Sequence, residues 1–191
     1  MKIVDVLLGR RREVRNDLDD LFALPTAAIT LQTAATFEPT GVGAVCFRAA
    51  EGSAFAAAEA EIVALLDNDD DPDIEKQVDE FGFTWLVSRQ DDMSALVTDL
   101  HAVNSALEAQ GFAPSLLCSL VSFRDNTGRT LALVYLYKQG TFYPFAPGPG
   151  EGKAQKRDNL LEMQVRDLVK NDLPVEPDLQ RWMPVWGAPG L

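Results

Sequence analysis

The chain has 191 residues, of which 47% are hydrophobic, and it carries a formal net charge of −12. This length suits one domain with an ordinary apolar core, and no apolar stretch approaches the roughly 20 residues that a membrane-spanning helix needs. The negative charge argues against a protein that covers a nucleic-acid backbone, because that role selects for clustered lysine and arginine.

The first fifteen residues differ from the rest in being basic, since Lys2 and four arginines outnumber Asp5 and Glu13. Their apolar residues have helical spacing up to Gly9, which predicts a short amphipathic helix. Such a helix lies on a bilayer with its arginines toward anionic headgroups. We therefore treat residues 1–15 as an N-terminal arm whose candidates for membrane contact or regulation are Leu7, Leu8, Arg10, Arg11 and Arg12. The alternative is that the two leucines dock on the domain and the arginines offset its acidity.

Residues 16–191 are expected to form one domain that begins with two helices, in "DLDDLFALP" and "LPTAAITLQTAA". The alternating segment Val42–Arg48 predicts the first strand. Ser53 is a plausible N-cap for the alanine-rich helix "AFAAAEAEIVALL". The acidic run "DNDDDPD" that follows predicts a solvated loop, because it lacks the glycine and the closing glutamate of an EF-hand.

The middle of the chain predicts more of the sheet. "IEKQVDEFGFTWLVSR" indicates two strands or one bent strand, with Phe81, Phe83, Trp85 and Val87 on one face. The strongest helical pattern is "DDMSALVTDLHAVNSALEAQGF", which Asp91 or Asp92 can cap and which ends at Gly111.

The second half then gives a hairpin, since "SLLCSLVSF" and "RTLALVYLY" flank the polar turn "RDNTGR". We expect "KQGTFYPFAPGPGEGK" to leave the sheet and "RDNLLEMQVRDLVK" to form the last helix.

The predicted order is helix, helix, strand, helix, strand, strand, helix, strand, strand, helix. Neighbouring strands joined by short turns are antiparallel, so this order predicts a single α+β domain with an antiparallel sheet and helices on one side. It excludes a doubly wound parallel sheet.

Two proline-broken aromatic runs, "TFYPFAP" and "RWMPVWGAP", are excluded from central strands. Burying both C-terminal tryptophans outweighs the entropy lost in ordering a few tail residues. We therefore expect the Trp- and Pro-rich tail, residues 172–191, to dock on the domain near the first run or on the open sheet face. The alternative is a partner groove, and the candidate partner-contact residues are Phe142, Tyr143, Phe145, Trp182 and Trp186.

Nothing in the sequence specifies a reaction. His101 is the single histidine, and no obvious base or metal-ligand partner accompanies it, although Asn104 and Ser105 lie nearby. Cys46 and Cys118 lie in apolar runs and are expected to be reduced core residues. "PGPGEGKA" fails as a phosphate loop because proline replaces its first glycine and alanine follows its lysine. We expect no catalytic residue, no cofactor and no metal ion.

Several long stretches resemble the PspAB family of PspA-associated proteins. They include "DLDDLFALPTAAITLQTA", "EFGFTWLV", "LVTDLHAVNSALEAQGF", "LALVYLYKQGTFYPFAP" and "DLPVEPDLQRWMPVWGAPGL", so the resemblance covers most of the chain. It implies an association with PspA, the membrane-remodelling phage-shock protein related to ESCRT-III, and a role as an accessory in the envelope-stress response. It supplies no catalytic motif.

Three hypotheses follow. The first is a non-enzymatic binding protein that acts with PspA. We expect it in the cytoplasm, because no signal-peptide pattern follows Met1–Leu8, and in part at the inner face of the membrane through the N-terminal arm. The second is a small hydrolase or ligand-binding enzyme that uses His101 with a cysteine or carboxylate. The third is a secretion-chaperone-like homodimer that binds extended partner segments.

Overall fold

The computed structural model describes residues 17–49, 52–66, 74–148 and 155–191. The predicted N-terminal arm, residues 1–15, and the predicted acidic loop, residues 67–73, lie outside this part of the chain.

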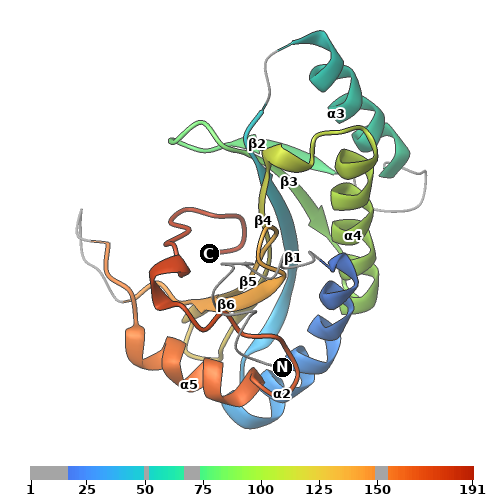
Figure 1. Ribbon diagram of the computed structural model, residues 1–191. Coiled ribbons are helices and arrows are strands. Elements are labelled where there is room, and N and C mark those ends of the chain that lie inside the picture. Colours follow the sequence, from blue (N-terminus) through green and yellow to red (C-terminus); the bar gives the residue numbers. More distant parts are fainter. Residues whose placement is uncertain (1–16, 50–51, 67–73, 149–154) are drawn as a thin grey trace, which may run out of the picture.

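The centre of the molecule is a six-stranded sheet in the order β2-β3-β1-β4-β5-β6, in which every pair is antiparallel (Figure 1). Chain neighbours pair within β2–β3 and β4–β5–β6, and β1 lies between β3 and β4. The strands are β1 (Glu38–Phe47), β2 (Glu75–Val78), β3 (Thr84–Arg89), β4 (Leu116–Arg124), β5 (Thr130–Leu136) and β6 (Thr141–Phe145).

Four α-helices accompany the sheet in the described residues: α2 (Leu24–Ala35), α3 (Ser53–Leu66), α4 (Met93–Ala109) and α5 (Asn159–Val169). Short 3₁₀ turns are η1 (Leu18–Ala23), η2 (Ala113–Ser115) and η3 (Leu179–Arg181). The predicted cap of α4 is confirmed, because the Asp92 carboxylate accepts the N–H of Ala95 at 2.8 Å. None of the described helices combines the length and the apolar character needed to cross a bilayer.

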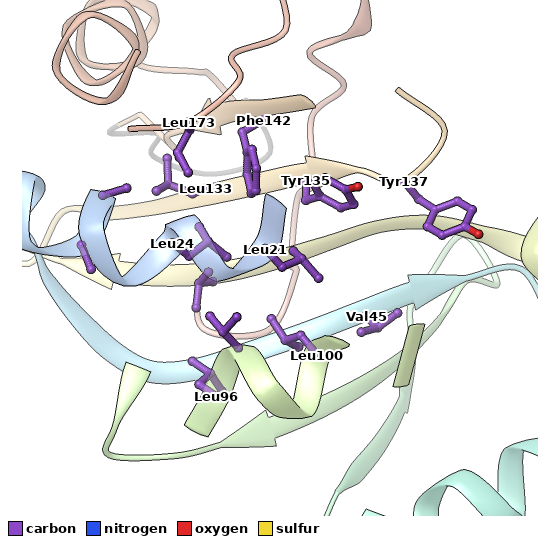
Figure 2. Close-up of a cluster of buried hydrophobic side chains, with 14 of the residues drawn as sticks. Leu21, Leu24, Val45, Leu96, Leu100, Leu133, Tyr135, Tyr137, Phe142 and Leu173 are labelled. Atoms are coloured by element: carbon purple, nitrogen blue, oxygen red, sulfur yellow. The ribbon is translucent and has the colours of Figure 1, made fainter. Parts of the chain in front are cut away.

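The larger core lies on the side of the sheet that the helices cover. Figure 2 shows Leu21 and Leu24 among side chains of the sheet and of α4. Gly43 in β1 allows close contact with α4, since a Cβ there would lie 3.1 Å from Leu96. The other fully buried side chains of this core include Leu31, Val97, Leu100, Leu133, Tyr135 and Phe142.

The opposite side of the sheet carries a second, smaller core, whose buried members come from the strands and the C-terminal segment and against which Met163 of α5 packs. Alternate residues of the strands point to this side, and the C-terminal segment, dark red in Figure 1, lies against them. Its buried members are Val42, Ala44, Cys46, Trp85, Val87, Cys118, Leu120, Ala132, Val134, Tyr143, Phe145, Trp182 and Ala188.

The predicted α+β class is confirmed, but the predicted order is wrong at one point. The segment expected to leave the sheet contains β6, which pairs with β5 from Thr141 to Phe145. Phe142 turns its N–H and C=O outward to Pro174 and Glu176. Pro144, two residues on, faces the same way, so its missing N–H removes no bond to β5. The proline excludes a central strand, as predicted, but an edge strand tolerates it, so the expectation that this segment leaves the sheet was wrong.

Candidate functional site: an apolar pocket under the C-terminal segment

Four of the five aromatic residues predicted to contact a partner, Tyr143, Phe145, Trp182 and Trp186, lie together on the sheet face that the C-terminal segment covers. Phe142 points to the opposite, helix-covered core. All five are buried except Trp186, which is half-buried. The Tyr143 and Trp182 rings stack with centroids 6.0 Å apart, and Phe145 meets Trp186 edge-on at 4.9 Å. In this conformation a partner can reach only Trp186 directly. The accessible surface of the site must therefore come from other residues.

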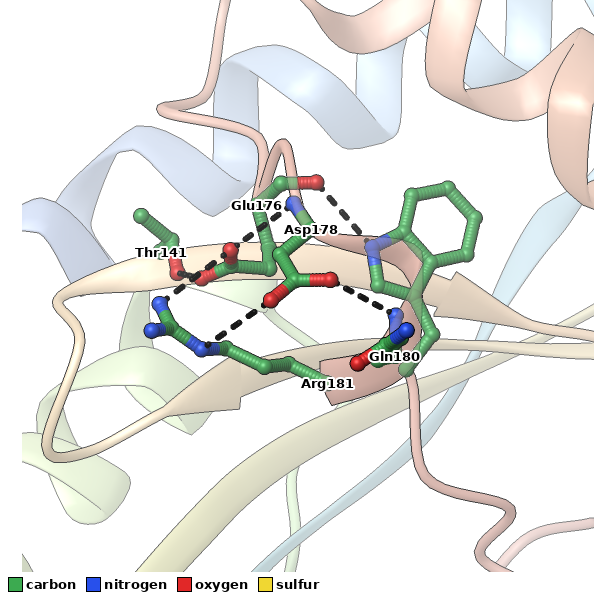
Figure 3. Close-up of polar contacts among 6 residues, drawn as sticks. Thr141, Glu176, Asp178, Gln180 and Arg181 are labelled. Atoms are coloured by element: carbon green, nitrogen blue, oxygen red, sulfur yellow. Dashed lines mark hydrogen bonds and ion pairs between the residues drawn. The ribbon is translucent and has the colours of Figure 1, made fainter.

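The C-terminal segment is fixed first at Glu176, which is 1% exposed. Figure 3 shows its carboxylate among Thr141, Asp178 and Arg181. It accepts the Thr141 hydroxyl at 2.7 Å and the Asp178 N–H at 3.0 Å, and Arg181 lies 3.5 Å away. The Glu176 carbonyl accepts the indole N–H of Trp182 at 3.0 Å. A buried carboxylate is tolerated here because its charge is hydrogen-bonded and paired.

A second anchor holds the backbone at Trp182 and Met183. The Arg157 guanidinium donates to the Trp182 carbonyl, and its Nε donates to Glu162 at 2.9 Å. The Tyr143 hydroxyl donates to the Met183 carbonyl at 2.7 Å. Together with the indole bond of Trp182, these contacts fix the point where the segment turns across the sheet.

The end of the chain is fixed separately. Ala188 is 3% exposed, and Gly190 lies so close to β4 that an added Cβ would be 2.1 Å from the Ser122 hydroxyl oxygen. Gly190 also has a φ of +85°, which favours glycine. Residues 183–187 therefore form a strap that is held at both ends, and we use this name below.

Between the strap and the sheet lies a cavity of about 320 Å³. Its floor is the strand face around Cys46 and Cys118, one side is the strap, and the other side is the turn between β2 and β3. The mouth carries two large apolar side chains, Phe81 at 62% exposed and Met183 at 61% exposed. The remaining wall residues are Asp79, Phe83, Trp85, Leu117, Leu136, Tyr143, Pro184, Val185 and Trp186.

Asp79 is the charged residue of the pocket wall, and its carboxylate is occupied by the protein. It accepts the indole N–H of Trp85 and the backbone N–H groups of Phe81 and Phe83, each at 2.9 Å. Burial alone would raise the pKa of Asp79, but these hydrogen bonds outweigh burial and lower the pKa below its usual value. Asp79 is thus an ionised structural acceptor that shapes the turn.

Cys46 and Cys118 are free thiols that face each other across β1 and β4. The contact with Cys118 and burial both raise the pKa of Cys46, and burial raises that of Tyr143. A raised pKa keeps the Cys46 thiol protonated, and a protonated thiol is a poor nucleophile and a poor metal ligand. The wall of the pocket is otherwise mostly apolar, so it can hold an apolar group.

His101 contacts Ser105, which the sequence places nearby, and also Asp19 and Phe22, which the sequence did not indicate. Its Nε2 lies 3.2 Å from an Asp19 carboxylate oxygen and its Nδ1 lies 3.4 Å from the Ser105 hydroxyl. Phe22 covers the ring at a centroid distance of 4.9 Å. The Asp19 side chain is 80% exposed, so water screens the electrostatic attraction between its carboxylate and the imidazole. His101 does not contribute to the wall of the pocket.

The remaining predicted sites add little to this geometry. Leu7, Leu8 and Arg10–Arg12 lie outside the described residues. Within the described ranges, no three His, Cys, Asp or Glu side chains gather in a way that could hold a metal ion.

Sequence reasoning found the walls of the pocket but missed the pocket. The period-two pattern of Phe81, Phe83 and Trp85 placed these rings on one face, and the proline-rich tail was expected to dock. What was missing is the register that brings Cys46 opposite Cys118 and leaves a gap beneath the strap.

The fold and the pocket together define a small α+β protein with an apolar cavity on the sheet face that the C-terminal segment covers. Residues 1–190 of the 191-residue chain match the family model of PspAB, described as PspA associated protein B. The protein therefore belongs to the PspAB family, and the family name indicates an association with PspA. No curated protein and no solved structure matches the chain.

Proposed function

We propose that this protein is a non-enzymatic accessory protein that acts by binding PspA in the envelope-stress response. The observation that carries the proposal is the family match over residues 1–190, which names this association. The pocket supports it, because the side chains of its wall are mostly apolar and its mouth exposes Phe81 and Met183. Exposed apolar groups beside a cavity are typical of a protein–protein contact.

The charge of the protein suits a basic partner surface. The chain carries −12 in total, while residues 1–15 are basic, so the excess negative charge belongs to the domain. Complementary charge steers encounter and favours one partner over others, and it makes association faster at low salt. We place the protein in the cytoplasm, with the N-terminal arm as its contact to the inner face of the membrane.

The test uses the purified full-length chain and purified PspA from the same genome. Isothermal titration calorimetry or sedimentation velocity should show a complex at micromolar concentrations, with weaker binding as salt rises. A heat signal or a faster-sedimenting species that saturates would support the proposal. Two components that sediment independently at tens of micromolar would overturn it.

A hydrolase is the competing function, and one observation favours it. The His101 ring lies within hydrogen-bonding distance of Asp19 on one side and of Ser105 on the other. If His101 acted as a base toward Ser105, a fluorophosphonate probe would label Ser105, and His101→Ala would abolish the labelling. We expect no labelling above that of Ser105→Ala. Stoichiometric labelling of Ser105 that requires His101 would replace the binding function with an enzymatic one.

A further inference from the structure

We propose that the pocket under the strap takes one large apolar side chain from an amphipathic helix of PspA, and that this contact anchors the complex. This inference rests on the proposed function, which supplies the partner. It adds the site on this chain and the chemistry of the segment that the site receives.

The size and shape of the pocket suit a side chain. Its volume of about 320 Å³ lies at the low end of the range for ligand cavities. Phe81 and Met183 extend the apolar surface beyond the mouth, so a helix whose side chain fills the cavity also covers them. Methionine adapts its shape to a partner, which suits a position on the rim.

The hydrogen bonding of the pocket favours a helix over an extended peptide. The indole N–H of Trp85 is bound to Asp79, and the Tyr143 hydroxyl is bound to the Met183 carbonyl. An extended or polyproline segment would need such donors for its own carbonyl groups. A helix satisfies its backbone internally and needs only an apolar contact.

The position of the pocket also argues against strand addition. The pocket opens on the face of the sheet, and the backbone groups of paired strands point along the plane of the sheet rather than out of its face. The outer edge of β6 is already bonded by Pro174 and Glu176 through Phe142. The arriving segment is therefore not a further strand at this end of the sheet.

The charged side chains around the mouth of the pocket favour a protein segment over a lipid chain as its occupant. Glu80 lies exposed in the turn that supplies Asp79 and Phe81, and Arg48 lies over the Phe83 ring at 5.7 Å. A mouth of mixed sign suits a helix that carries charges of both signs beside its apolar residue. The excess negative charge of the chain lies outside the basic residues 1–15, so an anionic membrane repels the domain that carries the pocket.

Affinity measurements on rim and filling variants test the site. Phe81→Ala and Met183→Ala remove apolar surface at exposed positions, and Leu136→Trp fills the cavity from its wall. We expect each to weaken PspA binding by about tenfold or more, as for an anchor residue. Ile29→Ala and Leu160→Ala are matched controls, because these residues are 62% and 72% exposed on helices that do not line the pocket. They should bind within about twofold of the unmodified chain.

A fluorescence measurement reports on the pocket itself. Met183→Cys places a reactive thiol on the rim, while the two native thiols are buried. An environment-sensitive label there should shift to the blue when PspA is added, and the same label at Leu160→Cys should not. Vesicles of phosphatidylethanolamine and phosphatidylglycerol, without PspA, should leave the label at position 183 unchanged.

The outcomes separate the two proposals. Loss of binding in the rim and filling variants, with intact controls and a blue shift at position 183, supports the pocket. Equal binding by all variants overturns the pocket while the proposed function stands. No binding by the unmodified chain overturns both, and a blue shift with vesicles alone overturns the choice of a protein segment. Circular dichroism melting of each variant identifies any that fail to fold. If a binding variant fails to fold, the fluorescence of the label at position 183 decides whether PspA occupies the pocket.

Discussion

Trp182 takes part in both anchors that hold the C-terminal segment, the one at Glu176 and the one at Arg157. Its ring stacks on Tyr143, its indole N–H donates to the Glu176 carbonyl at 3.0 Å, and its own carbonyl accepts from Arg157. The ring and the hydrogen bond contribute by different routes, since one buries apolar area and the other satisfies a carbonyl in a buried setting. Two substitutions at this residue separate them.

Trp182→Phe keeps most of the ring contact and removes the indole donor, which leaves the Glu176 carbonyl unpaired. We expect a loss of about 1–3 kcal/mol in the free energy of unfolding. Trp182→Ala also empties the space beside Tyr143 and should cost about 3–5 kcal/mol. Urea unfolding followed by circular dichroism measures both. Equal losses in the two variants would show that the ring contributes nothing beyond the hydrogen bond.

The β4–β5 turn shows how one carboxylate shapes a hairpin. Asp125 accepts the backbone N–H groups of Thr127 and Arg129, each at 2.9 Å, the Thr127 hydroxyl at 2.8 Å and the Arg129 Nε at 2.7 Å. Burial raises the pKa of Asp125, but these bonds outweigh burial and lower it from 3.8 to about 2. The predicted turn "RDNTGR" is therefore confirmed, and the structure adds the role of its aspartate, which the sequence did not indicate.

Because the pKa of Asp125 is lower in the folded chain, the ionised form stabilises the fold. This contribution is complete above the unfolded pKa of 3.8 and is lost as the pH falls through about 2. Asp125→Asn lacks it, so the difference in unfolding free energy between the two proteins should be constant above about pH 5 and shrink toward pH 2. Urea titrations between pH 2 and 7 measure this difference. A difference that stays constant down to pH 2 would contradict the assignment.

Removing one donor of the turn provides the matching variant. Thr127→Val deletes the hydroxyl bond at 2.8 Å and leaves the backbone bonds in place. The pKa of Asp125 should rise, so its stabilising contribution should be lost at a higher pH than in the unmodified chain. If Thr127→Val and the unmodified chain lose stability at the same pH, the hydroxyl bond is not one of the causes.

On the scale of the whole molecule, the sheet has helices on one face and the C-terminal segment on the other. The strap is therefore the cover of an apolar face that includes Val134 and Phe145. A chain that ends at Arg181 should expose this face, bind a hydrophobic dye and lose solubility. Size-exclusion chromatography and dye fluorescence check this result. A truncated chain that remains monomeric and binds no dye would show that the face needs no cover.

The N-terminal arm is a separate prediction at the same scale. Its basic residues should add about 1 kcal/mol each on an anionic surface. Co-sedimentation with anionic vesicles should fall when residues 1–15 are deleted and when salt is raised. Neutral vesicles are the control. Binding that is unchanged by the deletion would exclude membrane contact through the arm.

The chaperone-like hypothesis predicts a dimer, and light scattering distinguishes it. A chain of 20.9 kDa that elutes at its monomer mass over a wide concentration range would remove this hypothesis. A stable mass near twice that value would favour it over a monomeric binding protein. The measurement also fixes the stoichiometry against which PspA titrations are fitted.

The sequence by itself determined the class of fold and every α-helix and strand of the described residues except β6. Helical spacing marked α4, and alternation together with a polar turn marked the β4–β5 hairpin, because these patterns depend on residues a few positions apart. Asp92 as a cap and Asp125 in the turn are equally local. The two runs that combine aromatic rings with proline were also singled out, but the sequence did not indicate that Phe142 lies on the opposite face of the sheet from the other four rings.

Only the tertiary structure decided which of these groups meet. Tyr143 and Met183 lie 40 residues apart, and His101 and Asp19 lie 82 apart, so neither contact has a local signal. The place of β6 at the sheet edge made its proline acceptable, and the strap across the second face left a pocket beneath it. Local hydrogen bonds and periodicity are encoded by near neighbours, whereas cavities and long-range contacts depend on how the whole chain packs.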